Sequence, residues 1–211
     1  MFSYYSSEDL DPIQHVGILD ISQKSDSSLE WNGLSISNCP EAWKQICGCH
    51  GDTWTLVPQT NVRFLDRYAL DDDDMIEIRR WAVDAGYFEY ERQYKVSWYD
   101  YEYEETRYFL FGEDEEQEAR DEYEFKLEEE CDGIDFEVIE GMIRPTNRLL
   151  SISLVKVDTS MADDIAIMLY AEEELGYDGV WFEERYDPYA LSAPRGVIFN
   201  SCIDNFEAII N

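Results

Sequence analysis

The stretch GYDGVWFEERYDPYALSAPRGVIF, residues 176–199, combines polar residue types that enzymes use for chemistry with two apolar runs. Two adjacent acids, Glu183 and Glu184, directly follow the run GVWF, and Arg195 opens the second run after a proline. Adjacent side chains on an extended backbone point to opposite sides, so only one of the two acids can face a cleft. The stretch is either the wall of an active site or a strand-loop-strand unit that closes a core.

Two other groups of residues are typical of metal sites, and both are incomplete. Cys47, Cys49 and His50 supply one side of a zinc site, but a tetrahedral site needs a fourth ligand, and the only other histidine is His15. The aspartates at 71–74 lack the glycine and the spaced glutamate of a calcium loop and favour a helix N-terminus instead. The chain also lacks a glycine-rich phosphate loop and a G-x-S-x-G motif. We therefore expect no metal site.

The charge of the chain is strongly negative and unevenly distributed. Forty-eight acids against sixteen bases give a net charge of −32. Nineteen acids and three bases lie between Asp100 and Glu140, a net charge of −16. A field of this sign repels nucleic acid and anionic membranes, and it attracts basic protein surfaces. We therefore expect a basic protein surface as partner, with no direct nucleic-acid binding and no membrane.

The composition is that of a folded protein. Of the 211 residues, 45% are apolar and 15% aromatic, which is enough for one domain that carries an insertion. There is no apolar run of about 18 residues that would span a membrane. The stretch MFSYYSSEDLDP lacks the basic and apolar parts of a signal peptide, and the five cysteines are scattered. We expect reduced thiols and a cytoplasmic location.

The hydrophobic pattern predicts an α+β fold in three parts. Short β-like runs dominate residues 1–67 and 132–211, which we expect to form the two halves of one core domain. Residues 68–131 read as a helix, a hairpin and a very acidic second helix, and we expect them to be an insertion. MADDIAIMLYAEEEL, residues 161–175, is the clearest helix, with one buried stripe, and LLSISLVKV, residues 149–157, reads as a strand.

Several local motifs at the two ends of the chain follow one another in a recognisable order. FSYY reads as a first strand, and WNGLSISNCPEAW as a glycine-led strand with small hydroxyl residues before a helix. A late helix runs into LGYDGVWF, and the strand RGVIF follows. Residues 1–60 and 145–211 thus resemble the ADP-ribosyltransferase fold of phage- and toxin-associated proteins. The resemblance implies a split mixed or antiparallel sheet, NAD as the substrate, and transfer of ADP-ribose to a macromolecular target.

The resemblance also implies roles for the polar residues. Glu183, favoured over Glu184, would hold a ribose hydroxyl and stabilise the positive charge that develops as the nicotinamide bond breaks. Ser35 and Ser37 would support the same ribose or the carboxylate, and Arg195 would contact the pyrophosphate. Structural interpretations stay open beside these roles: a solvated loop for the acids, the outer face of an edge strand for the serines, and an ion pair for the arginine.

The first strand departs from the pattern of that family. Tyr4 or Tyr5 would occupy the position where the family has histidine or arginine, and a phenol lacks the positive charge of an arginine. This difference puts NAD binding in doubt, and it leaves open the interpretation of both tyrosines as core or rim aromatics.

A second hypothesis needs no catalysis. A folded protein with a large negative field can imitate DNA or RNA and occupy the basic groove of a nucleic-acid-binding protein. Small phage proteins that block restriction or CRISPR effectors resemble this description. The stretch EDEEQEARDEYEFKLEEE and the tyrosines near it would form the interface, as in an anti-defence inhibitor.

Overall fold

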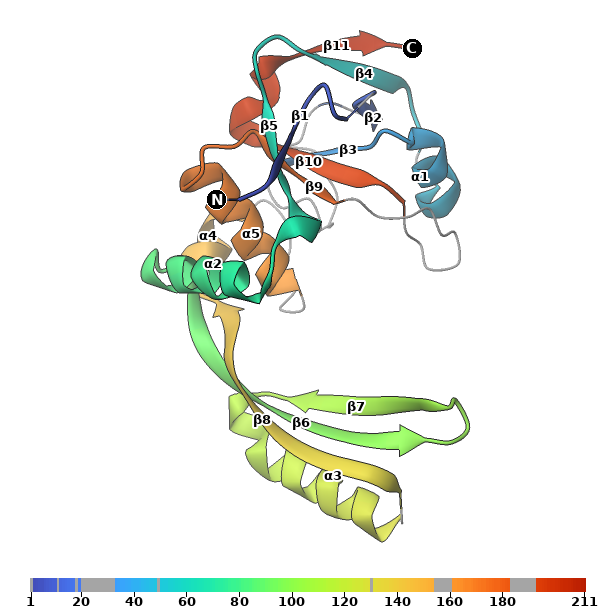
Figure 1. Ribbon diagram of the computed structural model, residues 1–211, viewed down its shortest axis with the longest axis vertical. Coiled ribbons are helices and arrows are strands. Elements are labelled where there is room, and N and C mark those ends of the chain that lie inside the picture. The colour runs from blue at the N-terminus through green and yellow to red at the C-terminus, as the bar shows by residue number, and fades with distance from the viewer. Residues whose placement is uncertain are drawn as a thin grey trace.

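The chain folds into a body, built from both ends of the sequence, and an arm that projects from it (Figure 1). The computed structural model describes residues 2–10, 12–17, 19, 33–48, 50–129, 131–153, 161–182 and 193–211. Helices and strands alternate irregularly along the chain, and most neighbouring strands are antiparallel, so the fold is α+β, in agreement with the sequence pattern.

A five-stranded sheet lies at the centre of the body. Its strands, in spatial order, are β1 (Tyr4–Ser6), β5 (Arg63–Asp66), β9 (Gly179–Phe182), β10 (Arg195–Phe199) and β3 (Gly33–Ile36). Only β5 and β9 are parallel, and the other neighbours are antiparallel. Every residue of β9 is buried, because elements cover the sheet on both faces, and this explains the uninterrupted apolar run GVWF.

The two faces of this sheet pack into separate hydrophobic clusters. Phe64 and Trp181 point to one face, where they pack with Leu56 of a second sheet. Leu65 and Val180 point to the opposite face and pack against helices. The second sheet has the order β11 (Phe206–Ile210), β4 (Thr53–Pro58) and β2 (Gln14–Val16). The body therefore has three layers, with the central sheet between helices and a smaller sheet.

Helix α5 forms the centre of the helical layer. Among the described residues, the helices of the body are α1 (Pro40–Cys47), α2 (Asp72–Asp84), α4 (Asn147–Ile152) and α5 (Ala162–Glu173), with 3-10 turns η3 (Arg67–Ala69) and η6 (Asn200–Asn205). Every residue from 165 to 171 is buried. The single buried stripe expected for this helix is therefore wrong. The helix contacts β9 on one side and α2 and β8 on others, so its middle turns, residues 165–171, have no face open to solvent.

Helix α2 begins in the aspartate run, as the sequence predicts, and belongs to the body. The Asp71 carboxylate accepts the backbone N–H of Asp74, and the Asp74 carboxylate accepts that of Asp71, which forms a capping box. Arg79 donates two hydrogen bonds to Asp163 at the start of α5, at 2.8 and 2.6 Å. These contacts fix α2 on α5, although the sequence pattern groups it with the insertion.

The arm is a three-stranded antiparallel sheet with one helix. Its elements are β6 (Phe88–Asp100), β7 (Glu105–Phe111), η4 (Glu113–Glu115), α3 (Glu116–Glu128) and β8 (Asp132–Pro145). The central strand β6 pairs with β7 on one side and with β8 on the other. The expected hairpin and acidic helix are both present. The arm extends past residue 131, because β8 pairs with β6 from Tyr99 back to Phe88.

The segment after β8 differs from its predicted structure. LLSISLVKV reads as a strand, but residues 149–152 belong to helix α4, and residues 154–157 lie outside the described part. The strand prediction is therefore wrong for residues 149–152. Thr146 caps the helix by accepting the N–H of Leu149, whose side chain is fully buried in the body. Capping by Thr146 and burial of Leu149 together favour a helical turn, and Ile152 is the only β-branched residue between 149 and 152.

Candidate functional site

The tyrosines and serines expected to bind NAD lie at two opposite edges of the central sheet. Tyr4 and Tyr5 are on β1, and Ser35 is on β3, so β5, β9 and β10 separate them. Tyr4 is half exposed and packs its ring against Tyr177, at 5.6 Å between centroids. Tyr5 packs against the cluster between the two sheets. The structure therefore does not bring the tyrosines to the serines.

Ser37 connects two segments of the body. Its hydroxyl donates to the carbonyl oxygen of Pro194 at 2.5 Å and accepts the backbone N–H of Cys39 at 2.9 Å. The indole of Trp43 donates to the same carbonyl at 3.0 Å. Ser37 is only 4% exposed. Its hydroxyl thus holds the start of β10 against α1, which is a structural use of the residue.

Arg195 lies near Ser37 at the start of β10. The next residue, Gly196, is opposite Ile36 in β3, and Arg195 itself is opposite Phe182 at the end of β9. The guanidinium lies over the Phe182 ring, 4.3 Å from its centroid. Glu183 and Glu184 follow β9 directly but lie outside the described residues, as does Cys49 of the cysteine-histidine group. Among the described residues, no three metal-ligating side chains gather into a group.

Two surface hollows of about 400 and 430 Å³ are present in the described part of the chain. One lies beside the N-terminus of α1 and the other at the base of the arm. Neither lining includes Tyr4, Ser35, Ser37 or Arg195. None of the described helices has the length and apolar character needed to cross a lipid bilayer.

The arm has a small core of its own on one face of its sheet. Tyr94 and Val96 of β6 are buried beneath Ala119 of α3, and Tyr123 and Phe136 pack beside them. Helix α3 contacts all three strands. This core is separate from both hydrophobic clusters of the body. The arm is therefore a distinct unit that carries its surface away from the body (Figure 1).

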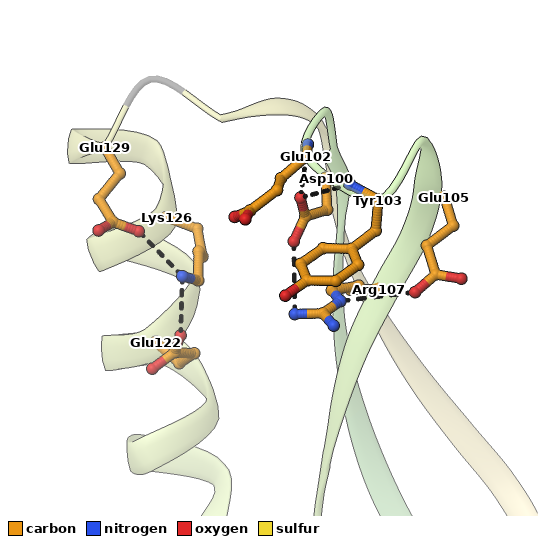
Figure 2. A network of polar contacts seen from close by, with 8 residues as sticks. All are labelled: Asp100, Glu102, Tyr103, Glu105, Arg107, Glu122, Lys126 and Glu129. Atoms are coloured by element: carbon orange, nitrogen blue, oxygen red, sulfur yellow. Dashed lines mark hydrogen bonds and ion pairs between the residues drawn. The ribbon is translucent and has the colours of Figure 1, made fainter.

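All three cations between residues 100 and 140 are held in ion pairs. Arg107 contacts Asp100 at 3.4 Å and Glu105 at 3.6 Å. Lys126 contacts Glu129, which follows α3, at 2.9 Å and Glu122 of α3 at 3.8 Å (Figure 2). Arg120 contacts Glu116, one turn before it on α3, at 2.7 Å. The positive side chains of this region are thus already neutralised.

Many acids of the arm remain without a cationic neighbour. Among the described residues, the exposed acids that form no ion pair within 4.0 Å are Glu102, Glu104, Glu113, Asp114, Glu115, Glu118, Asp121, Glu124, Glu128, Asp132 and Asp135. They lie on the hairpin turn, on η4, on α3 and at the start of β8. The arm therefore presents a surface whose net charge is uncompensated.

The tip of the arm is an ordered turn. The Asp100 carboxylate accepts the backbone N–H groups of Glu102 and Tyr103, at 3.0 and 3.4 Å (Figure 2). The Arg107 guanidinium lies over the Tyr103 ring, 4.0 Å from its centroid. Glu104 has a φ of 53°, the left-handed conformation that closes this turn. The turn is thus held from both sides, and it carries Glu102 and Glu104 outward.

Exposed aromatic and aliphatic side chains accompany the acids. Between about half and two thirds of each of the following side chains is exposed: Tyr101, Tyr103, Tyr108, Phe109, Leu110, Phe125 and Leu127. Tyrosine and phenylalanine are enriched at protein interfaces, because they bury much surface with few rotatable bonds. The combination of acids and aromatics is typical of a protein-binding surface, and the sequence indicates it through the tyrosine-rich hairpin.

One acid of the arm has a perturbed titration with a clear cause. The Arg120 guanidinium and the Tyr94 hydroxyl both donate to the Glu116 carboxylate and lower its pKa. The same hydrogen bond to Glu116 raises the pKa of Tyr94. Glu116 is therefore a structural acid that connects α3 to β6, unlike the exposed acids around it that form no ion pair.

No protein-family model matches this chain, and neither the curated proteins nor the solved structures include one that is significantly similar to it.

Proposed function

We propose that this protein binds a basic protein surface through the acidic arm and imitates a nucleic acid there. The observation that carries the proposal is the uncompensated charge of the arm, where every cation from residue 100 to 140 is paired and eleven exposed acids among the described residues are not. The projection of the arm from the body supports it further, because a projecting unit can enter a groove that the body cannot (Figure 1).

The charge spacing on α3 supports the comparison with a nucleic acid. Six of its thirteen residues are acidic. At about 1.5 Å of rise per residue, the helix carries one carboxylate per about 3.3 Å of length. One strand of B-DNA carries one phosphate per about 3.4 Å. Arg120 and Lys126 of the same helix are paired with Glu116 and Glu122, so the net negative charge of α3 is about two thirds of that on an equal length of one DNA strand. A groove lined by lysine and arginine for phosphates would meet this lower density on α3.

A competition experiment with two matched variants tests the proposal. The arm variant removes four unpaired acids through Glu102→Gln, Glu118→Gln, Glu124→Gln and Glu128→Gln. The body variant removes the same charge through Glu8→Gln, Asp73→Asn, Asp84→Asn and Asp204→Asn. Each protein is titrated into a complex of a lysine-rich histone with a fluorescent 20-base-pair duplex, and release of the duplex is measured by anisotropy.

We expect the wild-type protein and the body variant to release the duplex at similar concentrations. The arm variant should need at least about tenfold more protein, since each lost contact with a basic group costs a fraction of the binding free energy. Equal losses in both variants would mean that net charge alone acts and that the arm is not the binding element.

Transfer of ADP-ribose from NAD is the second candidate function. The position of Arg195 beside Ser37, next to the strand that leads into Glu183, favours it. The placement of Tyr4 at the opposite edge of the sheet speaks against a contribution from β1 to the same pocket. Nicotinamide release from NAD by the wild-type protein, lost in Glu183→Gln, would support this activity. No NAD binding at millimolar concentration would exclude it.

A further inference from the structure

Strand β7 forms a free edge of the arm sheet. The strand order is β7-β6-β8, and no described residue pairs with the outer side of β7. Its register with β6 runs without a shift from Tyr94 opposite Phe111 to Asp100 opposite Glu105. An edge strand of this kind leaves the N–H and C=O groups of alternate residues unpaired, so it is a template for a further strand.

Strand β7 lacks the prolines, lysines and bulges that usually protect an edge. Its seven residues, ETRYFLF, include no proline, glycine or lysine, and six of the seven are exposed. Its only cation, Arg107, is held by Asp100 and Glu105. The opposite edge, β8, differs, because it has two register shifts against β6 and two glycines with positive φ, Gly133 and Gly141. Of the two edges, β7 is therefore the regular one.

The charge of the arm selects the occupant of this edge. A second copy of the chain would place one region of net charge −16 against another, and like charges opposite each other destabilise a sheet. A basic segment would complement it. Because alternate side chains of a strand point to opposite faces, every second residue of an added strand would lie beside Tyr108 and Leu110, and the others on the face that α3 covers.

We propose that β7 accepts an extended segment of the partner, with alternating basic and apolar residues, as a fourth strand of the arm sheet. This inference rests on the proposed binding of a basic protein, and it identifies the form in which the partner is recognised. Backbone hydrogen bonds to β7 align the segment, and the unpaired acids of the hairpin turn and α3 attract its basic side chains.

Two peptides of equal charge test the backbone pairing. The first is Lys-Val-Lys-Val-Lys-Val-Lys-Val-Lys, and the second is Lys-Pro-Lys-Val-Lys-Pro-Lys-Val-Lys, which cannot form a continuous strand. Binding of each fluorescent peptide to the full chain is measured by anisotropy. We expect the first peptide to bind at least about tenfold more tightly, and the amide hydrogens of β7 to exchange more slowly when it is bound.

A pair of adjacent substitutions locates the site on β7. In an antiparallel pair, adjacent N–H groups point alternately toward the partner strand and away from it. One of Tyr108→Pro and Phe109→Pro therefore removes an N–H bonded to β6 and lowers the melting temperature. The other removes an outward N–H, melts close to the wild type, and should lose the preference for the strand-forming peptide.

The outcomes distinguish this inference from the proposed function. Equal binding of both peptides would overturn strand addition and leave charge-based binding intact. Binding of neither peptide would overturn both. A dimer in light scattering that the outward-facing proline variant abolishes would make a second copy the occupant of β7, and this too would overturn the inference.

Discussion

The negative charge of Glu116 stabilises the contact between α3 and β6 in the arm. Arg120 and Tyr94 both donate to its carboxylate, and these contacts lower its pKa. Because the folded pKa lies below the unfolded one, the contribution of Glu116 to stability is complete above the unfolded pKa. It is lost as the pH falls through the folded pKa. The contact between α3 and β6 therefore weakens only in acid.

Carbon-13 NMR of the side-chain carboxyl groups measures this directly. We expect Glu116 to titrate below the ordinary range of glutamate, and Tyr94→Phe to shift its midpoint upward, since one donor to the charged form is removed. A midpoint of Glu116 that Tyr94→Phe leaves unchanged would contradict the assigned hydrogen bond from the Tyr94 hydroxyl.

At the scale of the element, the capping box of α2 shows that neighbouring aspartates contribute differently to one helix N-terminus. Asp71 accepts the N–H of Asp74, whereas the exposed Asp73 forms no hydrogen bond or ion pair among the described residues. Asp71→Ala should reduce the free energy of unfolding by about 1 kcal/mol. Asp73→Ala removes the same charge in the same turn and should cost less, as only the helix-dipole contribution is lost.

Thermal unfolding followed by circular dichroism compares the two variants. For a protein of this length, the Asp71 variant should melt about 2–4 °C below the wild type. Equal melting temperatures for the two variants would show that the cap contributes nothing beyond charge.

Local sequence patterns predict where the helices and strands of this protein lie better than they predict which strands are neighbours in a sheet. The aspartate cap of α2 and the hairpin around residues 101–104 follow from capping residues and alternation. The apolar composition of residues 161–175 indicates helix α5, but not that its middle turns are buried on every side. Strand β8 also reads as a strand, but its sequence does not reveal that β6 is its neighbour, so the expected end of the insertion at residue 131 left it with the body. Pairing depends on the whole chain, and local preference does not encode it.

The same contrast between local patterns and long-range contacts applies to the candidate site. Composition and the tyrosine-rich hairpin indicate an acidic interaction surface, because charge and aromatic content are additive properties of a segment. The neutralisation of Arg107 by Asp100 and Glu105 requires three residues to meet at the tip, which no spacing rule predicts. The position of Tyr4 relative to Ser35 depends on strand order, and only the fold reveals it.

At the scale of the whole molecule, the separate cores of the body and the arm predict that the body folds alone. The two body clusters contain no residue from 92 to 141. Glu91 and Met142 are paired neighbours in β6 and β8, so an Asn-Gly turn can join them and replace residues 92–141. We expect this variant to unfold cooperatively at a melting temperature close to that of the wild type, with no release of duplex from the histone complex.

Calorimetry and the competition experiment together check both parts of this prediction. A broad, non-cooperative transition would mean that the arm contributes to the body's core. Full release of the duplex by the shortened protein would place the binding surface on the body.

The neck of the arm has a consequence for how this protein can change over generations. Phe88 lies opposite Pro145, so the chain leaves the body and returns to it at one place. A genetic exchange between these two points would replace the arm and leave the sheets and helices of the body in register. If the arm binds the partner as proposed, such an exchange would change the partner without altering the fold of the body.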